Sequence, residues 1–385
     1  MKGSGRCSKY ALAVLVFFYS GFVIFAQETP GSEKAKETEK NFRFSPFVAP
    51  AYTPELGLFV AGGGLLTFKT SPADEMLKRS SVPFSLGVST KEAVIFSTIM
   101  DTYWTPDRVR VSADIWYKDM PDNYWGVGYD AGRNTEKGED TTAYRRIWWQ
   151  VNPRVTVRIH ENLFTGVNLD FNRTQAKELS PGVAADSAIQ EYGLDNFNSG
   201  AGLILLYDSR DIPVNAYSGT YLSGTATFYG GFLGGDNTYR IFDFDYRQYL
   251  SVQRPGRTIA WQLSTRIGSG DVPWGELSQL GTPFDLRGYT WGQYRDKTML
   301  FGIIEYRHKF LKNTPNAFGR YESRHGVVGW VGAGAVGREL DDFGNILPNA
   351  GVGYRYEVQP RMNLRIDVGF GVETLNFYVN FNEAF

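Results

Sequence analysis

The sequence has 385 residues, of which 42% are hydrophobic, 15% aromatic and 21% charged, with a net charge of −1 at pH 7 and a mean hydropathy of −0.30. It is too apolar and aromatic for disorder, and too polar for a bundle of membrane helices, each of which needs about 20 successive apolar residues. The near-neutral charge argues against a nucleic-acid partner, whereas many aromatic residues together with 43 glycines favour β-structure.

The first 26 residues have the layout of a secretory signal peptide. A basic start precedes an apolar stretch from Ala11 to Phe25, and we expect cleavage after Ala26. An uncleaved anchor is the alternative, although about 15 apolar residues are few for a membrane span. Cleavage would remove the single cysteine, Cys7, and change the net charge to −4, so the exported chain could form no disulfide. Residues 27–44 are polar and charge-rich, and we interpret them as a periplasmic linker.

From residue 45 to residue 385, apolar and polar residues alternate with a period of two, which is typical of β-strands. In Met362–Gly371, for example, Leu364 and Ile366 share one face while Arg365 and Asp367 share the other. We place sixteen strands at 46–54, 57–69, 81–90, 92–104, 107–118, 141–159, 163–173, 198–208, 219–230, 238–251, 257–268, 298–310, 325–337, 347–358, 361–371 and 374–385.

Two architectures fit such strands: a transmembrane β-barrel and, as the alternative, a soluble β-sandwich with one wet face. The strands are long, however, where soluble sheets have strands of about 5 to 6 residues, and their number is even, as in bacterial barrels. The apolar face carries almost no charge, and a cation on a lipid face would cost about 2 to 4 kcal/mol. We therefore predict an all-β fold: a 16-stranded antiparallel transmembrane β-barrel in the bacterial outer membrane, with aromatic residues on the lipid face and at its two rims.

The connections differ in length between the two rims of this barrel. Short turns at 105–107, 160–162, 254–257 and 359–361 fall on one rim, and long loops at 119–140, 175–197 and 269–297 fall on the other. Short periplasmic turns and long external loops are the usual asymmetry of outer-membrane barrels. Both ends of the barrel segment are then expected on the periplasmic side.

Four motifs occur in order along the chain. They are Asn123–Gly128; a periplasmic turn with Asp208, Arg210 and Asp211; the loop motif Leu286-Arg287-Gly288-Tyr289 followed by Glu305-Tyr306-Arg307; and an ending with Phe377, Phe381 and Phe385. Together they resemble the barrel of the BamA/TamA-type outer-membrane assembly superfamily, the bacterial surface antigen family, over about residues 44–385.

The resemblance implies that the sixth external loop folds inward and carries Arg287 at its tip. It also implies that Phe377, Phe381 and Phe385 form a C-terminal signal read by the machinery that assembles barrels. The family usually has an Asp on the thirteenth strand, but Gly332 stands there in this sequence. A buried guanidinium needs a carboxylate partner, so we expect Arg287 to pair with Asp367 or Glu305; an external Arg in a solvated loop is the alternative.

A second departure concerns domains. Relatives carry periplasmic repeat domains before the barrel, whereas the linker expected here is too short for one, so we predict a stand-alone form. Gly332–Gly337 matches the dinucleotide fingerprint in letters only, since no helix is expected after it. His160, His308 and His325 lack metal-ligand spacing. We therefore expect no enzymatic activity, metal or cofactor.

By resemblance, the protein would help to insert or translocate proteins or lipids at a weak seam between the first and last strands. Pro46 and Pro50 are compatible with such a seam, because proline cannot donate a hydrogen bond to a neighbouring strand. The alternatives are a passive pore or transporter for small solutes, and an anchor for a separately encoded periplasmic partner. The partners expected in every case are outer-membrane lipid and the barrel assembly machinery, and no nucleic acid.

Overall fold

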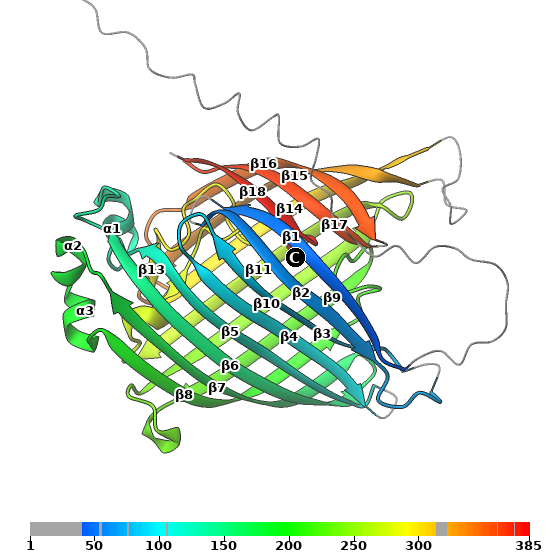
Figure 1. Cartoon of the computed structure of the whole chain (residues 1–385), viewed down its shortest axis with the longest axis horizontal. Coiled ribbons are helices and arrows are strands. Elements are labelled where there is room, and N and C mark those ends of the chain that lie inside the picture. The colour runs from blue at the N-terminus through cyan, green and yellow to red at the C-terminus, as the bar shows by residue number, and fades with distance from the viewer. Residues whose placement is uncertain are drawn as a thin grey trace, which may run out of the picture.

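The computed structural model describes residues 41–53, 56–74, 77–104, 107–312, 322–359, 361–372 and 374–385. These residues form a closed antiparallel barrel of sixteen strands, with three short helices at one end (Figure 1). The prediction of a 16-stranded β-barrel is therefore confirmed. The predicted signal peptide and most of the predicted linker lie outside the described residues. No helix in the described ranges is long and apolar enough to cross a membrane, a finding that has no bearing on strands.

The barrel strands follow one another around the wall in chain order. They are β1 (Arg43–Thr53), β2 (Gly57–Phe68), β3 (Ser80–Ser89), β4 (Val94–Trp104), β5 (Val109–Asn123), β6 (Ala143–His160), β7 (Leu163–Lys177), β8 (Asp195–Asp208), β9 (Gly219–Tyr229), β10 (Tyr239–Ser251), β11 (Arg257–Gly270), β14 (Thr298–Leu311), β15 (Glu322–Gly337), β16 (Leu347–Gln359), β17 (Met362–Phe370) and β18 (Leu375–Phe381).

The seam that closes the barrel is its weakest pairing. β1 pairs with β2 along its whole length, from Arg43 to Thr53, whereas β1 and β18 share the single pair Tyr52 and Val379. The rings of Tyr52 and Phe377 also lie 5.9 Å apart across this seam. Hydrogen bonds between strands hold a barrel together in lipid, so the wall is most weakly joined at this seam.

The two faces of the wall follow the predicted alternation. On β17, Leu364 and Ile366 face outward, while Arg365 and Asp367 face inward and are fully buried. Several aromatic residues correct our expectation, because they lie inside the barrel instead of on the lipid face or its rims. They are Trp116, Trp148, Tyr249, Trp274, Trp330 and Tyr378. Their rings supply apolar surface for the segment between β11 and β14, which a purely polar inner wall could not do.

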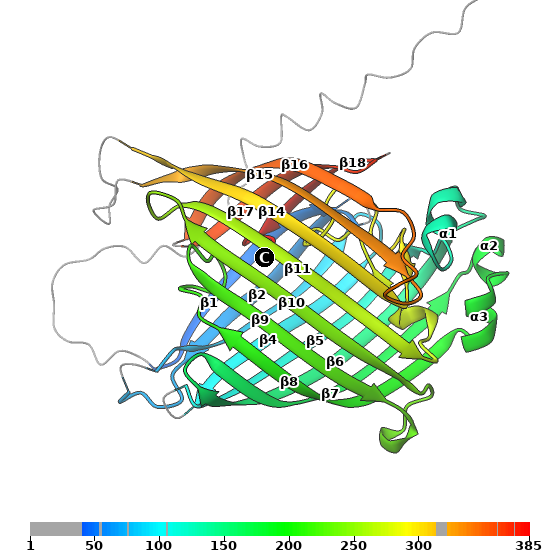
Figure 2. The ribbon, with the colours of Figure 1, turned by 180° about the vertical axis from the view of Figure 1, so that it is seen from behind.

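Helices mark the rim with the long loops. α1 (Tyr129–Asn134) follows β5, and α2 (Pro181–Ala184) and α3 (Ser187–Tyr192) follow β7. Asp186 begins α3 by accepting a hydrogen bond from the N–H of Ala188 at 2.9 Å, as an N-cap residue should. The opposite rim carries tight turns, such as the one at Asn162 with φ of 59°, but also the longer connections of residues 69–79 and 209–218. We call the rim with the helices the loop rim and the other the turn rim (Figures 1 and 2). The predicted separation of long loops from short turns therefore holds only in part; residues 105, 106 and 360 of the predicted turns lie outside the described residues.

The inner wall changes character around the barrel. Inward positions of β1 to β4 carry no charge from Phe47 to Ile99, and Ile99 is 52% exposed. Inward positions of β14 to β17 instead carry Glu305, Arg307, Arg355, Arg365 and Asp367, all buried. Buried charges need partners. The charged half therefore has to be covered by something, and the segment between β11 and β14 lies against it.

The last strand is shorter than predicted, because β18 ends at Phe381. Asn382 adopts φ of 64° and turns the chain, and residues 383–385 leave the sheet. Glu383 and Phe385 are then buried, at 7% and 6% exposure. Phe385 therefore does not lie on the outer face with Phe377 and Phe381, as an alternating strand would have placed it.

Candidate functional site

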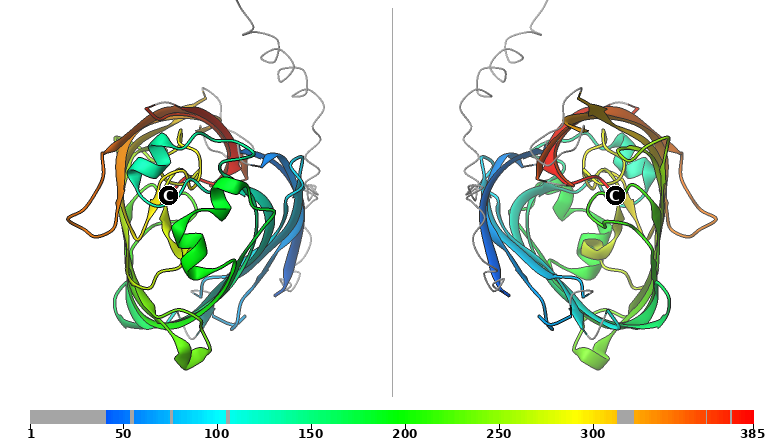
Figure 3. Two further views of the ribbon diagram at one scale, coloured as in Figure 1. Left: turned by 90° about the vertical axis from the view of Figure 1, so that its left-hand side faces the viewer. Right: turned by 90° about the vertical axis from the view of Figure 1, so that its right-hand side faces the viewer.

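The segment from Asp271 to Lys297, called loop six here, connects β11 to β14. It begins with η3 (Trp274–Glu276) and closes its own base with a two-residue ladder between β12 (Ser278–Gln279) and β13 (Arg295–Asp296). Figure 3 shows this segment, in yellow, within the ring of strands. A loop that ties its ends together in this way loses less conformational freedom when its tip binds elsewhere.

The base of loop six is held by the first motif. The Arg295 guanidinium donates to the main-chain oxygen of Asn123 at 2.9 Å and lies 4.6 Å from the ring centre of Tyr124. The N–H of Gly128 in turn donates to the oxygen of Arg295 at 2.8 Å. Trp274 meets the Tyr124 ring edge-on at 6.2 Å. The motif Asn123–Gly128 is therefore a docking surface for loop six.

A tight turn before the tip is built around Asp285. Its carboxylate accepts hydrogen bonds from the N–H groups of Gly281 and Thr282, each at 2.8 Å, and from the Thr282 hydroxyl at 2.6 Å; it also accepts one from the N–H of Leu286. Burial raises the pKa of Asp285 to about 6, and these hydrogen bonds oppose that rise. The turn presents Leu286 and Arg287 to the strand wall, where both are fully buried.

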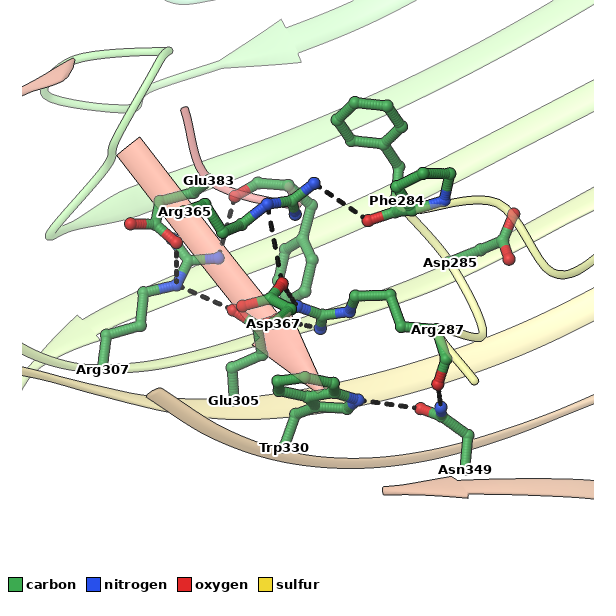
Figure 4. A network of polar contacts seen from close by, with 12 residues as sticks. Phe284, Asp285, Arg287, Glu305, Arg307, Trp330, Asn349, Arg365, Asp367 and Glu383 are labelled. Atoms are coloured by element: carbon green, nitrogen blue, oxygen red, sulfur yellow. Dashed lines mark hydrogen bonds and ion pairs between the residues drawn. The ribbon is translucent and has the colours of Figure 1, made fainter. Parts of the chain in front are cut away.

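Arg287 contacts both of the carboxylates that the sequence offered as partners. Its Nη1 lies 2.9 Å from Oδ2 of Asp367 on β17, and its Nη2 forms a hydrogen-bonded ion pair with Glu305 on β14 (Figure 4). All three side chains are fully buried. A buried pair of this kind is costly to break, because removing one partner leaves a charge without compensation.

The residues that pack beneath Arg287, Trp330 and Asn349, were not identified from the sequence. The guanidinium stacks on Trp330 of β15 at 3.6 Å from the ring centre, and the Trp330 indole N–H donates to Oδ1 of Asn349 at 3.1 Å (Figure 4). Asn349 also donates to the main-chain oxygen of Arg287. No acid is needed at Gly332, since the ring two residues earlier covers one face of the cation. Trp330 looked like an ordinary apolar strand residue in the sequence, so only its unusual size could have drawn attention to it.

Gly288 and Tyr289 of the motif form hydrogen bonds with β18 and β16, near the seam. The N–H of Gly288 donates to the hydroxyl of Tyr378 on β18 at 3.0 Å, and the Tyr289 hydroxyl donates to the oxygen of Pro348 at 2.7 Å. Gly288 has φ of 122°, and a Cβ there would lie 2.6 Å from the main-chain nitrogen of Gly371. Only glycine allows this approach, which explains the glycine of the motif.

The ion network continues toward the turn rim. Arg355 bridges Asp367 at 2.6 Å and Glu383 at 2.8 Å. Arg307 pairs with Glu305 at 2.9 Å (Figure 4) and also donates to the oxygen of Phe385 at 2.9 Å. Residues 383–385 and the tip of loop six therefore bind the same set of strand side chains. Glu383 lies within the C-terminal motif but far from Arg287 in sequence, so the sequence did not indicate this connection.

The remaining residues singled out in the sequence lie elsewhere. Asp208 and Arg210 form a bidentate ion pair at the turn rim, with Nε 2.9 Å from Oδ1, and Asp211 lies in the same turn. Phe377 and Phe381 face outward on β18. The structure thus brings Leu286, Arg287, Gly288 and Tyr289 together with Glu305 and Asp367, and Phe385 joins the same network through Arg307. It leaves Phe377, Phe381 and the turn with Asp208 apart from them.

The lumen beyond loop six contains a chamber of about 510 Å³. Loop six forms one side of it, and the inner faces of β5 to β7 and β9 to β11 form the other. Some of its charges are paired within the wall, as in Arg154 with Asp114 at 2.8 Å, and Arg266 of β11 pairs with Glu276 of loop six at 3.4 Å. Among the described residues, no cluster of His, Cys, Asp and Glu side chains could hold a metal ion.

Arg287 and its partners Glu305, Asp367 and Trp330 hold loop six against the strand wall, and we call these four residues the lock. Glu305 and Asp367 are each held by more than one guanidinium, and the cations around them are buried. Carboxylates held in this way have no free lone pair directed at a substrate, so the arrangement favours fixing a loop over moving protons.

Comparison with solved structures gives the same fold. BamA from Haemophilus ducreyi lacking POTRA domains 1–3 aligns with a TM-score of 0.60 at 13% identity, over 88% of this chain and 70% of that one. CdiB from Escherichia coli aligns with a TM-score of 0.55 at 11% identity, over 93% and 67%. CdiB from Acinetobacter baumannii aligns with a TM-score of 0.53 at 13% identity, over 94% and 66%. No protein with a curated description matches the sequence.

The family model described as the Omp85 superfamily domain matches residues 79–376, which include loop six, both carboxylates that bind Arg287 and the turn with Asp208. Together with the sixteen-stranded barrel and the Arg287 lock, this match shows that the chain belongs to the Omp85 superfamily of outer-membrane β-barrels.

Proposed function

We propose that this barrel assists the insertion or translocation of proteins or lipids at the outer membrane, through the seam between β1 and β18. The observation that carries the proposal is the single residue pair, Tyr52 with Val379, that joins these strands. Every other neighbouring pair of strands is joined by a ladder of several residues. A seam of this kind opens at low cost, since few hydrogen bonds must be broken before a strand or an acyl chain enters.

The contrast between the two sides of the seam supports this route. On the β18 side, the wall is fixed from within by loop six through Gly288 and Tyr378. On the β1 side, the inner positions from Phe47 to Ile99 are small or apolar. Opening would therefore move β1 and its neighbours while β18 stays in place, without exposing an unpaired charge.

A disulfide across the seam tests the proposal. We expect the double substitution Tyr52→Cys and Val379→Cys, in a protein whose Cys7 is replaced by Ser, to lock the seam when oxidised. The readout is the rate at which a urea-unfolded eight-stranded outer-membrane protein folds into liposomes that contain the barrel. We expect the native barrel to accelerate this folding and the oxidised variant to lose the acceleration, with recovery on reduction.

The matched control places the disulfide one strand pair away. Tyr52→Cys with Leu58→Cys links β1 to β2 at paired positions and leaves the seam free. This control should retain the acceleration in both redox states. Full activity of the oxidised seam variant would exclude the seam as the route.

The chamber favours a second candidate function, a pore for small polar solutes. A lumen volume of about 510 Å³ is large enough for a small metabolite. Planar-bilayer conductance separates the two candidates, since a pore gives a large steady conductance that a locked seam does not change.

A further inference from the structure

The turn motif with Asp208, Arg210 and Asp211 takes no part in the lock or the seam. It begins the connection between β8 and β9, residues 209–218, which we call the strap. β8 and β9 are adjacent antiparallel strands, and such strands can be joined by two residues. The other connections on this rim range from short turns at residues 161–162 and 252–256 to the longer one at residues 69–79. The strap is therefore longer than its position in the barrel requires.

The strap has a defined internal structure. The Asp211 carboxylate accepts hydrogen bonds from the N–H groups of Tyr217 at 3.0 Å and Ser218 at 3.4 Å, so that the strap folds back on itself. The N–H of Asp211 donates to the oxygen of Ser218 at 3.2 Å. At its start, the Asp208–Arg210 ion pair rests on Tyr221, with the guanidinium 4.3 Å from the ring centre. A loop fixed by these bonds can hold a position away from its own strands.

That position is on the far side of the barrel mouth. Arg361 lies in the turn between β16 and β17, six strands further around the wall than β9. Its Nη2 lies 2.9 Å from Oδ2 of Asp211, its Nη1 donates to the oxygen of Asn215 at 2.6 Å, and its guanidinium stacks at 3.4 Å on the ring of Tyr217. A single arginine thus binds three residues of the strap, and the strap crosses from β8 to β17.

Packing beneath the strap is tight. Ala216 is 1% exposed and belongs to the same apolar cluster as Tyr249 and Phe385. The Ser251 hydroxyl of β10 donates to the oxygen of Tyr217 at 3.1 Å. The cavity between the strap and the inner wall, which Val328 and Arg355 help to line, has a volume of about 30 Å³, against about 510 Å³ for the chamber above. That space holds only one or two water molecules.

We propose that the strap is a stopper that Arg361 latches across the mouth of the barrel at the turn rim, separating the lumen from the solution on that side. The long connection, the contacts across the mouth and the small cavity beneath them all follow from this role. The stopper does not depend on the seam, since it closes the axial path whether or not β1 and β18 part.

A brace that merely joins two turns is the competing interpretation, and the two differ in what release of the latch does. We would replace Arg361 by Asp, so that two carboxylates face each other, and combine it with Asp211→Arg to restore an opposite-charge pair. Two readouts are needed: the rate at which a polar maleimide modifies Val328→Cys beneath the strap, with Cys7 replaced by Ser, and the conductance of the barrel in planar bilayers.

We expect Arg361→Asp to speed modification of Val328→Cys about tenfold or more and to raise the conductance, and the double variant to reverse both in part. The control Arg173→Asp breaks an exposed ion pair with Asp195 at the loop rim and should change neither readout.

Heat-modified mobility on gels reports whether each variant has folded, and Arg361→Ala replaces Arg361→Asp if the reversal prevents folding. Unchanged modification of Val328→Cys in a folded latch variant overturns the proposal. Faster modification without a rise in conductance also overturns it, because the strap would then be a brace and not the seal.

Discussion

The strands on the two sides of the seam are stabilised in different ways. β14 to β18 enclose a packed core in which Arg287, Trp330 and Asp367 are buried, and loop six covers their charges. From Phe47 to Ile99, β1 to β4 face the lumen with small and apolar side chains, and Ile99 stays half exposed. One barrel therefore contains a wall held from inside and a wall held only by its strand pairing. Stability concentrates where ions and aromatic rings interlock, and freedom of movement remains where they do not.

Removing the central cation should give the largest contrast between the two walls. Arg287→Ala leaves Glu305 and Asp367 buried beside an empty site, and we expect it to lower the free energy of unfolding by about 3 to 5 kcal/mol. Urea unfolding in lipid vesicles, followed by tryptophan fluorescence, measures this loss. Arg173→Ala, which removes an exposed ion pair, should cost at most about 1 kcal/mol. Equal losses for both variants would contradict the account of the lock.

Truncating one aromatic side chain on each wall tests the difference in packing. Trp330→Leu removes the platform of Arg287 at a position that is 4% exposed, and we expect a loss of about 3 kcal/mol. Phe59→Leu on β2, at a half-buried inner position, should cost about 1 kcal/mol or less. The same unfolding assay compares them. A larger loss at Phe59 would mean that the β1 to β4 wall contains a core of its own.

Two glycines sharpen the comparison further. Gly288→Ala places a Cβ against the backbone of Gly371 at φ of 122°, and we expect it to cost about 1 to 3 kcal/mol. Gly62→Ala on β2 has nothing within 4 Å of the added Cβ and should be neutral or stabilising by about 0.5 kcal/mol. Protease sensitivity of loop six should rise for the first variant only, and a rise for both would point to a general loss of structure.

A fall in pH should stabilise loop six and destabilise the strap. The pKa of Asp285 is raised to about 6 by burial, so its contribution to stability is present below about pH 4 and is lost as the pH rises through 6. The pKa of Asp211 is lowered, because hydrogen bonds from Tyr217 and Ile212 and the charge of Arg361 outweigh its burial. The stability that Asp211 contributes to the strap is therefore present at pH values above the ordinary pKa of a carboxyl group, and it is lost as the pH falls through the lowered pKa. Hydrogen exchange should therefore show loop six loosening between pH 4 and pH 7 and the strap loosening only below pH 4. Asp285→Asn should abolish the change in loop six.

The sequence predicted what short-range alternation can encode. The period-two pattern of Leu364 to Asp367 located both faces of β17, and the tally of such segments gave the number of strands. The partners of Arg287 were also within reach, because few acids lie on inward positions near loop six. The strand ends were less accurate, since the turn at Asn382 depends on what Glu383 can bind after leaving the sheet.

Contacts between distant segments were missed. Arg361 and Asp211 are far apart in the chain, and neither residue type nor local pattern marks them as partners. The aromatic residues as a group were expected on the lipid face and at its rims, whereas the indole of Trp330 faces inward under a guanidinium. In both cases the decisive quantity is the path of a loop across the barrel, which an alternating pattern does not contain.

The position of the lock along the chain has a consequence for biogenesis. Arg287 precedes Asp367 by 80 residues, and Gly288 precedes Tyr378 by 90. Contacts of such separation form late, because loop closure costs entropy before any bond repays it. Glu305, on the strand that follows loop six, can neutralise Arg287 early, but Asp367 and Tyr378 arrive only with the final two strands. A chain cut short before β17 would therefore keep loop six only half fixed, so completion of the lock gives the cell a chemical means of telling a finished barrel from a truncated one.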